Sequence, residues 1–150
     1  MELYKELYFN ELGDERGHLV VAEFPHNIPF VIKRIFYIYG SDKNVVRGKH
    51  ANRRSEFVLI NVSGSCKVKI DTGKDQKIVN LDKPHKGLYL NKMVWKDMYD
   101  FSDDSVLLVL SNIAYDPNEY IRDYNEYLKE MRDKGWNYLL LCQYTIMRWI

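Results

Sequence analysis

The residues best suited to chemistry lie in the segment Arg47–Glu56, directly before the apolar run Phe57–Ile60. If this segment is a strand, alternate side chains share a face, so His50, Asn52 and Arg54 would point the same way. Each of the three could bind an oxygen-rich ligand, and histidine can also exchange a proton near neutral pH. The segment therefore predicts a site in which His50 is the candidate base.

A lone strand histidine is more often a partly buried, hydrogen-bonded residue than a catalyst. Here the surroundings favour a site, because basic residues lie near its proposed mouth or on adjoining strands. Guanidinium groups suit phosphate in particular. The basic candidates for ligand binding are Arg34, Arg47, Arg53, Arg54 and Lys96. At least one of Arg53 and Arg54 is expected to be an ordinary surface residue.

Aromatic residues supply a second group of candidates. Tyr37 and Tyr39 would share one strand face, opposite Arg34. A phenol can donate a hydrogen bond to a carbonyl or stack on a base, and core packing is the alternative expected for one of the pair. Trp95 follows a predicted turn and precedes Lys96, so both join the candidate binding residues.

The composition limits the classes of function. The chain has 150 residues, 22 basic and 21 acidic, which gives no electrostatic case for nucleic acid or an anionic membrane. Cys66 and Cys142 match no zinc or redox spacing, and the N-terminal residues lack a signal-peptide core. The apolar segment 136–150 is shorter than the ~20 residues that a membrane span needs. We therefore expect a cytoplasmic protein.

The pattern of apolar runs predicts a β-rich domain with one helix near its end. Short apolar runs separated by turn residues indicate a sandwich or barrel. The predicted strands are Leu19–Phe24, Phe30–Tyr39, Glu56–Val62, Cys66–Ile70, Lys77–Leu81, Gly87–Leu90 and Ser105–Leu110. Asp116 is the expected cap of a helix that runs to about Lys134 and stops at Gly135. Its apolar face is expected to consist of residues at three- and four-residue spacing, namely Tyr120, Ile121, Tyr124, Tyr127, Leu128 and Met131. This gives a domain at 1–134 and a tail at 135–150 without an assigned role.

Four segments together resemble a known family. They are Phe36–Gly40, Arg47–Ala51, Trp95–Met98 and Asp116–Tyr124, in this order. The combination is similar to the sugar 3,4-ketoisomerases of the WxcM-like cupins, over roughly residues 5–130. The resemblance implies an all-β fold, a small cupin (jelly-roll) β-barrel with a C-terminal helix. It also implies a homodimer that exchanges N-terminal strands.

The resemblance implies an isomerase that needs no metal and no other cofactor. Family members convert dTDP-4-keto-6-deoxyglucose into its 3-keto isomer, which is then aminated to 3-amino-3,6-dideoxyhexoses of surface polysaccharides such as lipopolysaccharide O-antigen. It implies that His50 is the base and that Tyr37 or Tyr39 is the active-site phenol. The basic residues and Trp95 would then hold the nucleotide-sugar.

The chain departs from the family pattern at two positions. The family usually continues His-Ala-His, with a glutamine five residues later, where this chain has Asn52 and Phe57. Asn52 also replaces a histidine that metal-binding cupins use, so we expect no metal site. An amide can orient or polarise an oxygen but cannot relay a proton near pH 7. Asn52 is therefore a candidate catalytic residue without acid–base capacity.

The C4 configuration of the product depends on how many groups transfer protons. If His50 works alone, the proton leaves and returns on one sugar face, which predicts the axial C4 hydroxyl of a galacto product. A gluco product would need a second donor, such as a tyrosine or Lys96. Two alternatives remain open: an epimerase of a related keto-sugar, and a non-catalytic cupin that binds a nucleotide-sugar.

Overall fold

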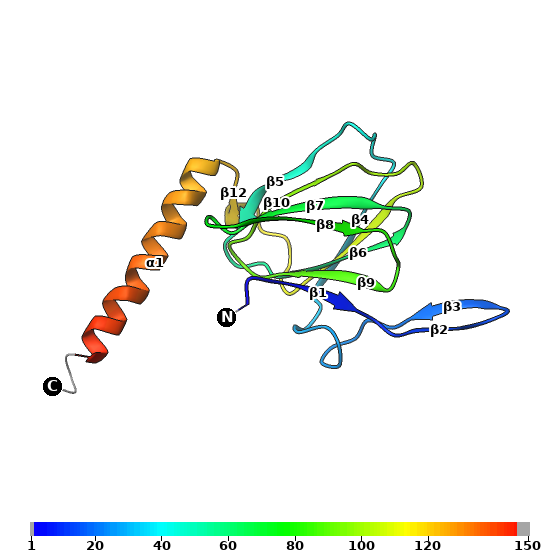
Figure 1. The fold of residues 1–150 in the computed structure, drawn as a ribbon, viewed down its shortest axis with the longest axis horizontal. Coiled ribbons are helices and arrows are strands. Elements are labelled where there is room, and N and C mark those ends of the chain that lie inside the picture. The colour runs from blue at the N-terminus through cyan, green and yellow to red at the C-terminus, as the bar shows by residue number, and fades with distance from the viewer. Residues whose placement is uncertain (1, 147–150) are drawn as a thin grey trace.

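Two antiparallel five-stranded sheets face each other in the computed structural model, which describes residues 2–146 and the side chains of residues 2–135 (Figure 1). The first sheet has the order β1 (Tyr4–Tyr8), β9 (Lys86–Leu90), β6 (Phe57–Ser63), β11 (Val106–Ser111) and β4 (Arg34–Tyr39). The second has the order β12 (Tyr120–Ile121), β5 (Arg47–Asn52), β10 (Trp95–Tyr99), β7 (Cys66–Asp71) and β8 (Gln76–Leu81). The prediction of an all-β, cupin-like fold is confirmed.

The core lies between the sheets because their strands alternate apolar and polar residues. On β7, Cys66, Val68 and Ile70 are buried, as the alternation predicts. On β6 the residues Phe57–Ile60 are all buried, since this strand is covered on both faces. Its inner side chains join the central core, and its outer ones pack under a cluster that contains Phe9, Ile28 and Phe30.

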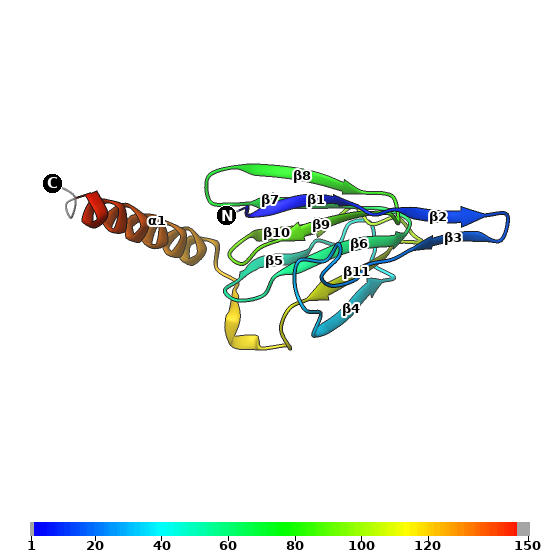
Figure 2. The same ribbon diagram turned by 90° about the horizontal axis from the view of Figure 1, so that it is seen from below.

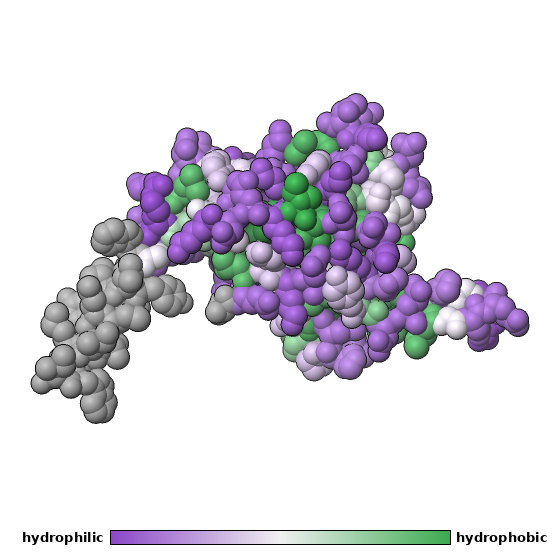
Figure 3. Space-filling model, in the orientation of Figure 1, coloured by the Kyte–Doolittle hydropathy of each residue, from purple (hydrophilic) through white to green (hydrophobic). Residues whose placement is uncertain are grey.

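The hairpin of β2 (Glu11–Asp14) and β3 (Gly17–Val20) extends beyond the two sheets (Figure 2). The strands β1, β2, β10 and β12 were not predicted from the sequence pattern, and the predicted strand Leu19–Phe24 overlaps β3 only at Leu19 and Val20. The face of the molecule shown in Figure 3 is mostly hydrophilic, with apolar groups gathered in a few places.

The α-helix begins later and ends later than the sequence predicted. Asp116 caps a 3-10 turn, η1 (Pro117–Glu119), instead of an α-helix. The α-helix α1 (Tyr124–Ile146) begins later, where the Asp123 carboxylate accepts a hydrogen bond from the backbone N–H of Glu126 at 2.8 Å. It runs through Gly135 instead of ending there. No helix in the described part of the chain is long and apolar enough to span a membrane.

Candidate active site

A cavity of about 140 Å³ lies between the two sheets and contains the residue around which the sequence predicted a site. Its polar side chains all belong to the second sheet, and the first sheet contributes apolar ones. The polar lining is Arg47, His50, Lys96 and Tyr120; the apolar lining from the first sheet is Phe36, Ile38, Phe57, Leu59 and Val109. The cavity therefore has one chemically active wall.

His50 is held as a neutral base. Its Nδ1 lies 2.9 Å from the carbonyl oxygen of Gly48, and a carbonyl can only accept, so Nδ1 carries the proton. Nε2 is then left with a free lone pair. Burial first, and then the nearby charge of Lys96, lower the pKa of His50 to about 4, although the hydrogen bond to the Gly48 carbonyl opposes the shift. At neutral pH the imidazole is ready to accept a proton.

An irregularity in β5 brings Arg47 and His50 into the same cavity although three positions separate them. On β10, Lys96 pairs with His50, but Asp97 pairs with Gly48 and Met98 with Arg47, so Lys49 is an extra residue. Gly48 and Lys49 have φ values of 88° and 55°. Strict alternation would have placed Arg47 on the outer face.

The role of Gly48 can be tested by substitution. Its positive φ disfavours any residue with a side chain, and there is no space for an added Cβ. An added Cβ would lie 2.7 Å from the carbonyl oxygen of Lys96. We expect Gly48→Ala to lower the free energy of unfolding by about 1–3 kcal/mol and to reduce turnover by displacing His50 from Lys96. Denaturant melts and activity assays check this.

Gly40→Ala is the matched control for Gly48→Ala. Gly40 also has a positive φ, 65°, but its added Cβ would meet nothing within 4 Å. It should show the conformational cost without the loss of turnover. Equal effects of the two substitutions on turnover would contradict the role given to the close contact between β5 and β10.

Lys96 is the second proton-active group of the cavity. Its side chain is 5% exposed, and its Nζ donates to Asn52 Oδ1 at 2.7 Å and lies 4.7 Å from the centre of the Phe57 ring. Burial lowers the pKa of Lys96 to about 7; the charge of Glu119 opposes the shift and that of Arg34 adds to it. Lysine can therefore both donate and accept a proton near neutral pH at this position.

The predicted arginines separate into two pairs. Arg47 lines the cavity. Arg34 does not line it, but its guanidinium lies 5.2 Å from the ring centre of Phe36, which does, and 5.7 Å from the ring centre of Tyr115. Arg53 and Arg54 do not line the cavity either.

Arg53 and Arg54 instead tie structural elements together. Arg53 Nη2 binds Glu130 at 2.7 Å and Glu126 at 3.1 Å, which holds α1 against the sheet. Arg54 forms an ion pair with Asp116. Both side chains are outside the cavity. Arg54, whose side chain is 60% exposed, is a surface residue as expected for at least one of the two, whereas Arg53 anchors α1.

The predicted phenols are also outside the cavity. Tyr37 and Tyr39 are 61% and 70% exposed on the outer face of β4 and stack on each other, with ring centroids 6.1 Å apart. The phenol inside the cavity is Tyr120, whose ring centroid lies 4.9 Å from that of His50. The helical spacing in the sequence predicts Tyr120 on the apolar face of a helix, but Tyr120 belongs to strand β12. The pairing of β12 with β5 is what places it beside His50.

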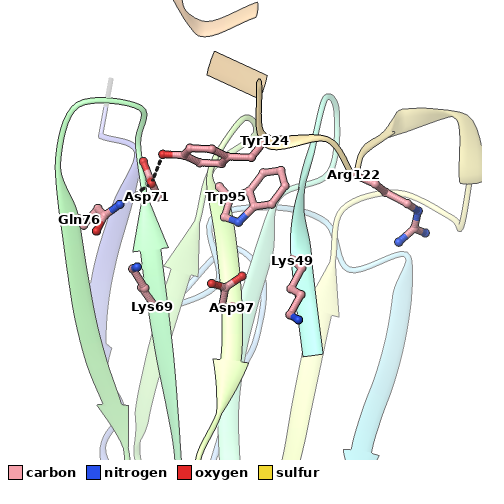
Figure 4. A pocket seen from close by; sticks show the side chains of 8 residues that line it. All are labelled: Lys49, Lys69, Asp71, Gln76, Trp95, Asp97, Arg122 and Tyr124. Carbon is pink, nitrogen blue, oxygen red and sulfur yellow. Dashed lines mark hydrogen bonds between the residues drawn. The ribbon is translucent and has the colours of Figure 1, made fainter. Parts of the chain in front are cut away.

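Trp95 lies on the face of β10 opposite to Lys96. Its ring packs on Tyr124 and Tyr127, at centroid distances of 5.2 and 5.5 Å. It lines a separate opening of about 470 Å³ on the outside of the second sheet (Figure 4). The other residues around this opening are Lys49, Lys69, Asp71, Gln76, Asp97, Arg122 and Tyr124. Trp95 is thus separated from His50 by the sheet.

No group of three or more His, Cys, Asp and Glu residues in the described part of the chain could hold a metal ion. The cavity wall offers one imidazole, one amine and one phenol as its reactive groups. Such a set can move protons and stabilise a negatively charged oxygen.

Comparison with known proteins gives consistent matches. Residues 3–132 match the family described as FdtA, WxcM-like, C-terminal. A TDP-4-oxo-6-deoxy-alpha-D-glucose-3,4-oxoisomerase from Aneurinibacillus thermoaerophilus is 42% identical over 125 residues, which is 83% of this chain and 90% of that protein.

Three solved structures are similar over most of their length. A TDP-fucose-3,4-ketoisomerase from Campylobacter jejuni is 45% identical, with a TM-score of 0.81 over 85% of this chain and 95% of that one. A TDP-quinovose 3,4-ketoisomerase from the same organism is 40% identical, with a TM-score of 0.82 over 86% of this chain and 99% of that one. A sugar 3,4-ketoisomerase from Thermoanaerobacterium thermosaccharolyticum in complex with TDP is 38% identical, with a TM-score of 0.85 over 88% of this chain and 96% of that one. The chain therefore shares its fold with named sugar 3,4-ketoisomerases.

Proposed function

The chain belongs to the FdtA family of WxcM-like, C-terminal domains, and we propose that it catalyses the 3,4-ketoisomerisation of dTDP-4-keto-6-deoxyglucose. The observation that carries this proposal is the pair formed by His50, a neutral base with a free Nε2, and Lys96, on neighbouring strands of one cavity wall. Similarity to named 3,4-ketoisomerases supports the substrate class.

The proposed reaction transfers one carbon-bound proton and one oxygen-bound proton. His50 Nε2 takes the proton from C3, which the C4 ketone acidifies, and the C3–H electrons form a C3=C4 double bond. The electrons of the C4 carbonyl move to its oxygen, which takes a proton from the Lys96 ammonium group. Lys96 then accepts the proton of the C3 hydroxyl, and His50 returns its proton to C4. The ketone is now at C3.

We assign the diphosphate to Arg47, which lines the cavity, and to Arg34, which lies against the lining residue Phe36. Guanidinium groups bind phosphate oxygens in pairs of hydrogen bonds. For the active-site phenol we propose Tyr120 in place of Tyr37 or Tyr39, because Tyr120 lies beside His50. The location of the reaction in the cytoplasm, and the use of its product for 3-amino sugars of surface polysaccharides, stay predictions.

The one-sided cavity favours a particular C4 configuration. The polar lining residues lie on the second sheet, and the opposite wall consists of apolar residues such as Phe36 and Leu59. A proton removed from the C3 side that faces His50 would therefore return to C4 from the same side. On a gluco-configured substrate this gives an axial C4 hydroxyl, the galacto product. Named enzymes of both TDP-fucose and TDP-quinovose type are among the similar structures, so the product must be measured.

Proton NMR of the protein with dTDP-4-keto-6-deoxyglucose in D₂O tests the function and the configuration. We expect loss of the C3 proton signal and a new 3-keto sugar whose H4 coupling reports an equatorial proton. Tight binding with ligand-induced stabilisation, but no exchange, would support the non-catalytic alternative. Inversion at C3 without movement of the ketone would support an epimerase.

We also propose a homodimer in which the N-terminal strands are exchanged. The β2–β3 hairpin protrudes from the body of the molecule (Figure 3) and carries the cross-strand pair Leu12 and Leu19, each 58% exposed. Exposed apolar side chains on a protruding hairpin are typical of a surface that a second copy covers.

The double substitution Leu12→Asp with Leu19→Asp should convert the dimer into a monomer. Light scattering coupled to size exclusion should give twice the 17.9 kDa chain mass for the native protein and a single chain mass for the variant. Ile78→Asp is the control, because Ile78 is similarly exposed, 54%, but lies on β8. A native monomer, or a dimer that survives the double substitution, would rule out the hairpin as the contact.

A further inference from the structure

A buried carboxylate lies behind the active wall of the cavity. Glu119, the last residue of η1, is 2% exposed. Its Oε2 accepts from the backbone N–H groups of Arg54 and Ser55, each at 2.8 Å, and its Oε1 accepts from the Ser55 hydroxyl and from Asn52 Nδ2, the latter at 2.9 Å. Burial raises the pKa of Glu119, but these hydrogen bonds outweigh it and bring the pKa below its ordinary value. The group is therefore a carboxylate at neutral pH.

Glu119 determines which way the Asn52 amide points. An ionised carboxylate can only accept hydrogen bonds, so the NH₂ group of Asn52 must face Glu119. The amide oxygen must then face the opposite direction, where it accepts from Lys96 Nζ at 2.7 Å. In the reversed orientation the NH₂ group would meet the lysine, and two donors would face each other.

We infer that Glu119 is a positioning residue, which acts through Asn52 to hold the Lys96 amine in the cavity and to favour its protonated form. This inference rests on the proposed function for its catalytic meaning, but the link between the three side chains does not depend on it. It also gives Asn52 a role that an amide can perform, because orientation requires no proton exchange. The Nζ hydrogens that Asn52 does not use remain for a substrate oxygen.

The charges around Lys96 explain why one carboxylate matters. Arg34 on β4, and Arg47 and His50 on β5, are basic groups near the cavity, whereas Asp97 next to Lys96 points to the opposite face of β10. Among the residues whose side chains the structure describes, Glu119 is thus the negative charge that favours the ammonium form of Lys96. Its removal should disfavour that form in a medium with little water.

The direct test is the titration of the Lys96 side chain by NMR in protein with labelled lysine, with Lys96→Met to assign the signal. In Glu119→Gln we expect the Lys96 pKa to fall by about one unit or more. Asn52→Leu, which keeps Glu119 but removes the coupling amide, should lower it as well. Glu126→Gln is the matched control, because Glu126 pairs with Arg53 on the exposed side of α1. It should leave the titration of Lys96 unchanged.

Activity supplies a second readout that separates this inference from the proposed function. If the protein is an isomerase, Glu119→Gln should lower kcat more than it raises KM and should shift the alkaline limb of the pH profile to lower pH. A shifted titration in a protein that does not turn over the keto-sugar would sustain the inference and reject the function. An unshifted Lys96 titration in both Glu119→Gln and Asn52→Leu would overturn the inference, whatever the activity.

Discussion

His50→Gln is expected to abolish the release of the C3 proton of dTDP-4-keto-6-deoxyglucose, with a loss of turnover of about 10²–10⁴-fold. Glutamine keeps a polar group of similar size, but its amide cannot accept a proton near neutral pH. The half-buried position and the single hydrogen bond of His50 to Gly48 make large structural damage unexpected. Deuterium exchange at C3, followed by proton NMR in D₂O, measures the effect before any product forms.

His85→Gln is the matched control for this substitution. His85 is also half-buried, but its ring contacts Glu11 at 3.2 Å, far from the cavity in the fold. We expect the His85→Gln variant to catalyse exchange of the C3 proton at the native rate. Native exchange in His50→Gln would transfer the role of base to another group, of which Lys96 is the nearest candidate in strand register.

The sequence predicted the central part of the site because strand alternation is a local property. His50 and Asn52 lie two positions apart on β5 and both face the second sheet's inner side, as the pattern requires. The same rule separates Trp95 from Lys96, which are consecutive residues of β10 and so belong to opposite faces. The sequence makes both residues candidates because they follow a predicted turn, and only the strand β10 assigns them to opposite faces.

The parts that the sequence did not predict depend on contacts between distant segments. Arg47 is a candidate by residue type, but strand alternation would place it on the outer face. It reaches the cavity through the extra residue Lys49 in β5, and the glycine before Lys49 was the available signal. Tyr120 was missed because its spacing to Ile121 and Tyr124 also fits a helical face. The cap that marks the true helix start is Asp123, and the earlier Asp116 satisfies a 3-10 turn instead.

Arg53 illustrates why residue type alone does not identify a ligand-binding arginine. It stands next to Asn52, yet its guanidinium faces away from the cavity and binds two carboxylates of α1. These partners are more than seventy positions away in the sequence. The local sequence around an arginine is therefore the same whether it binds a ligand or anchors a helix, and only the position of these two carboxylates in the fold distinguishes the two roles.

Lys96→Met should lower turnover by about 10²–10⁴-fold and at the same time make the protein more stable at pH 6. Lys96 is buried beside Phe57, where a methionine can pack, and the native lysine is charged at this pH because its folded pKa is about 7. Removing a buried charge is favourable, although Asn52 loses one hydrogen bond worth about 1–3 kcal/mol. We expect a net gain of roughly 1–3 kcal/mol in the free energy of unfolding.

The pH dependence identifies Lys96 as the cause. Its pKa is lower in the folded chain, about 7, than the ordinary 10.5, so between these values the unfolded chain holds a proton that the folded chain lacks. Native stability therefore rises with pH through this window, and the variant lacks this contribution. The stability gain of Lys96→Met over the native protein, measured in urea melts, should shrink by about 2–3 kcal/mol between pH 6 and pH 9.

Lys69→Met is the control, because Lys69 lies on the outer face of β7. It should show the native pH dependence and native turnover. If the free energy of unfolding of Lys96→Met changes with pH in parallel with that of the native protein, Lys96 does not titrate in this range. Proton transfer between the two sugar oxygens would then need another group.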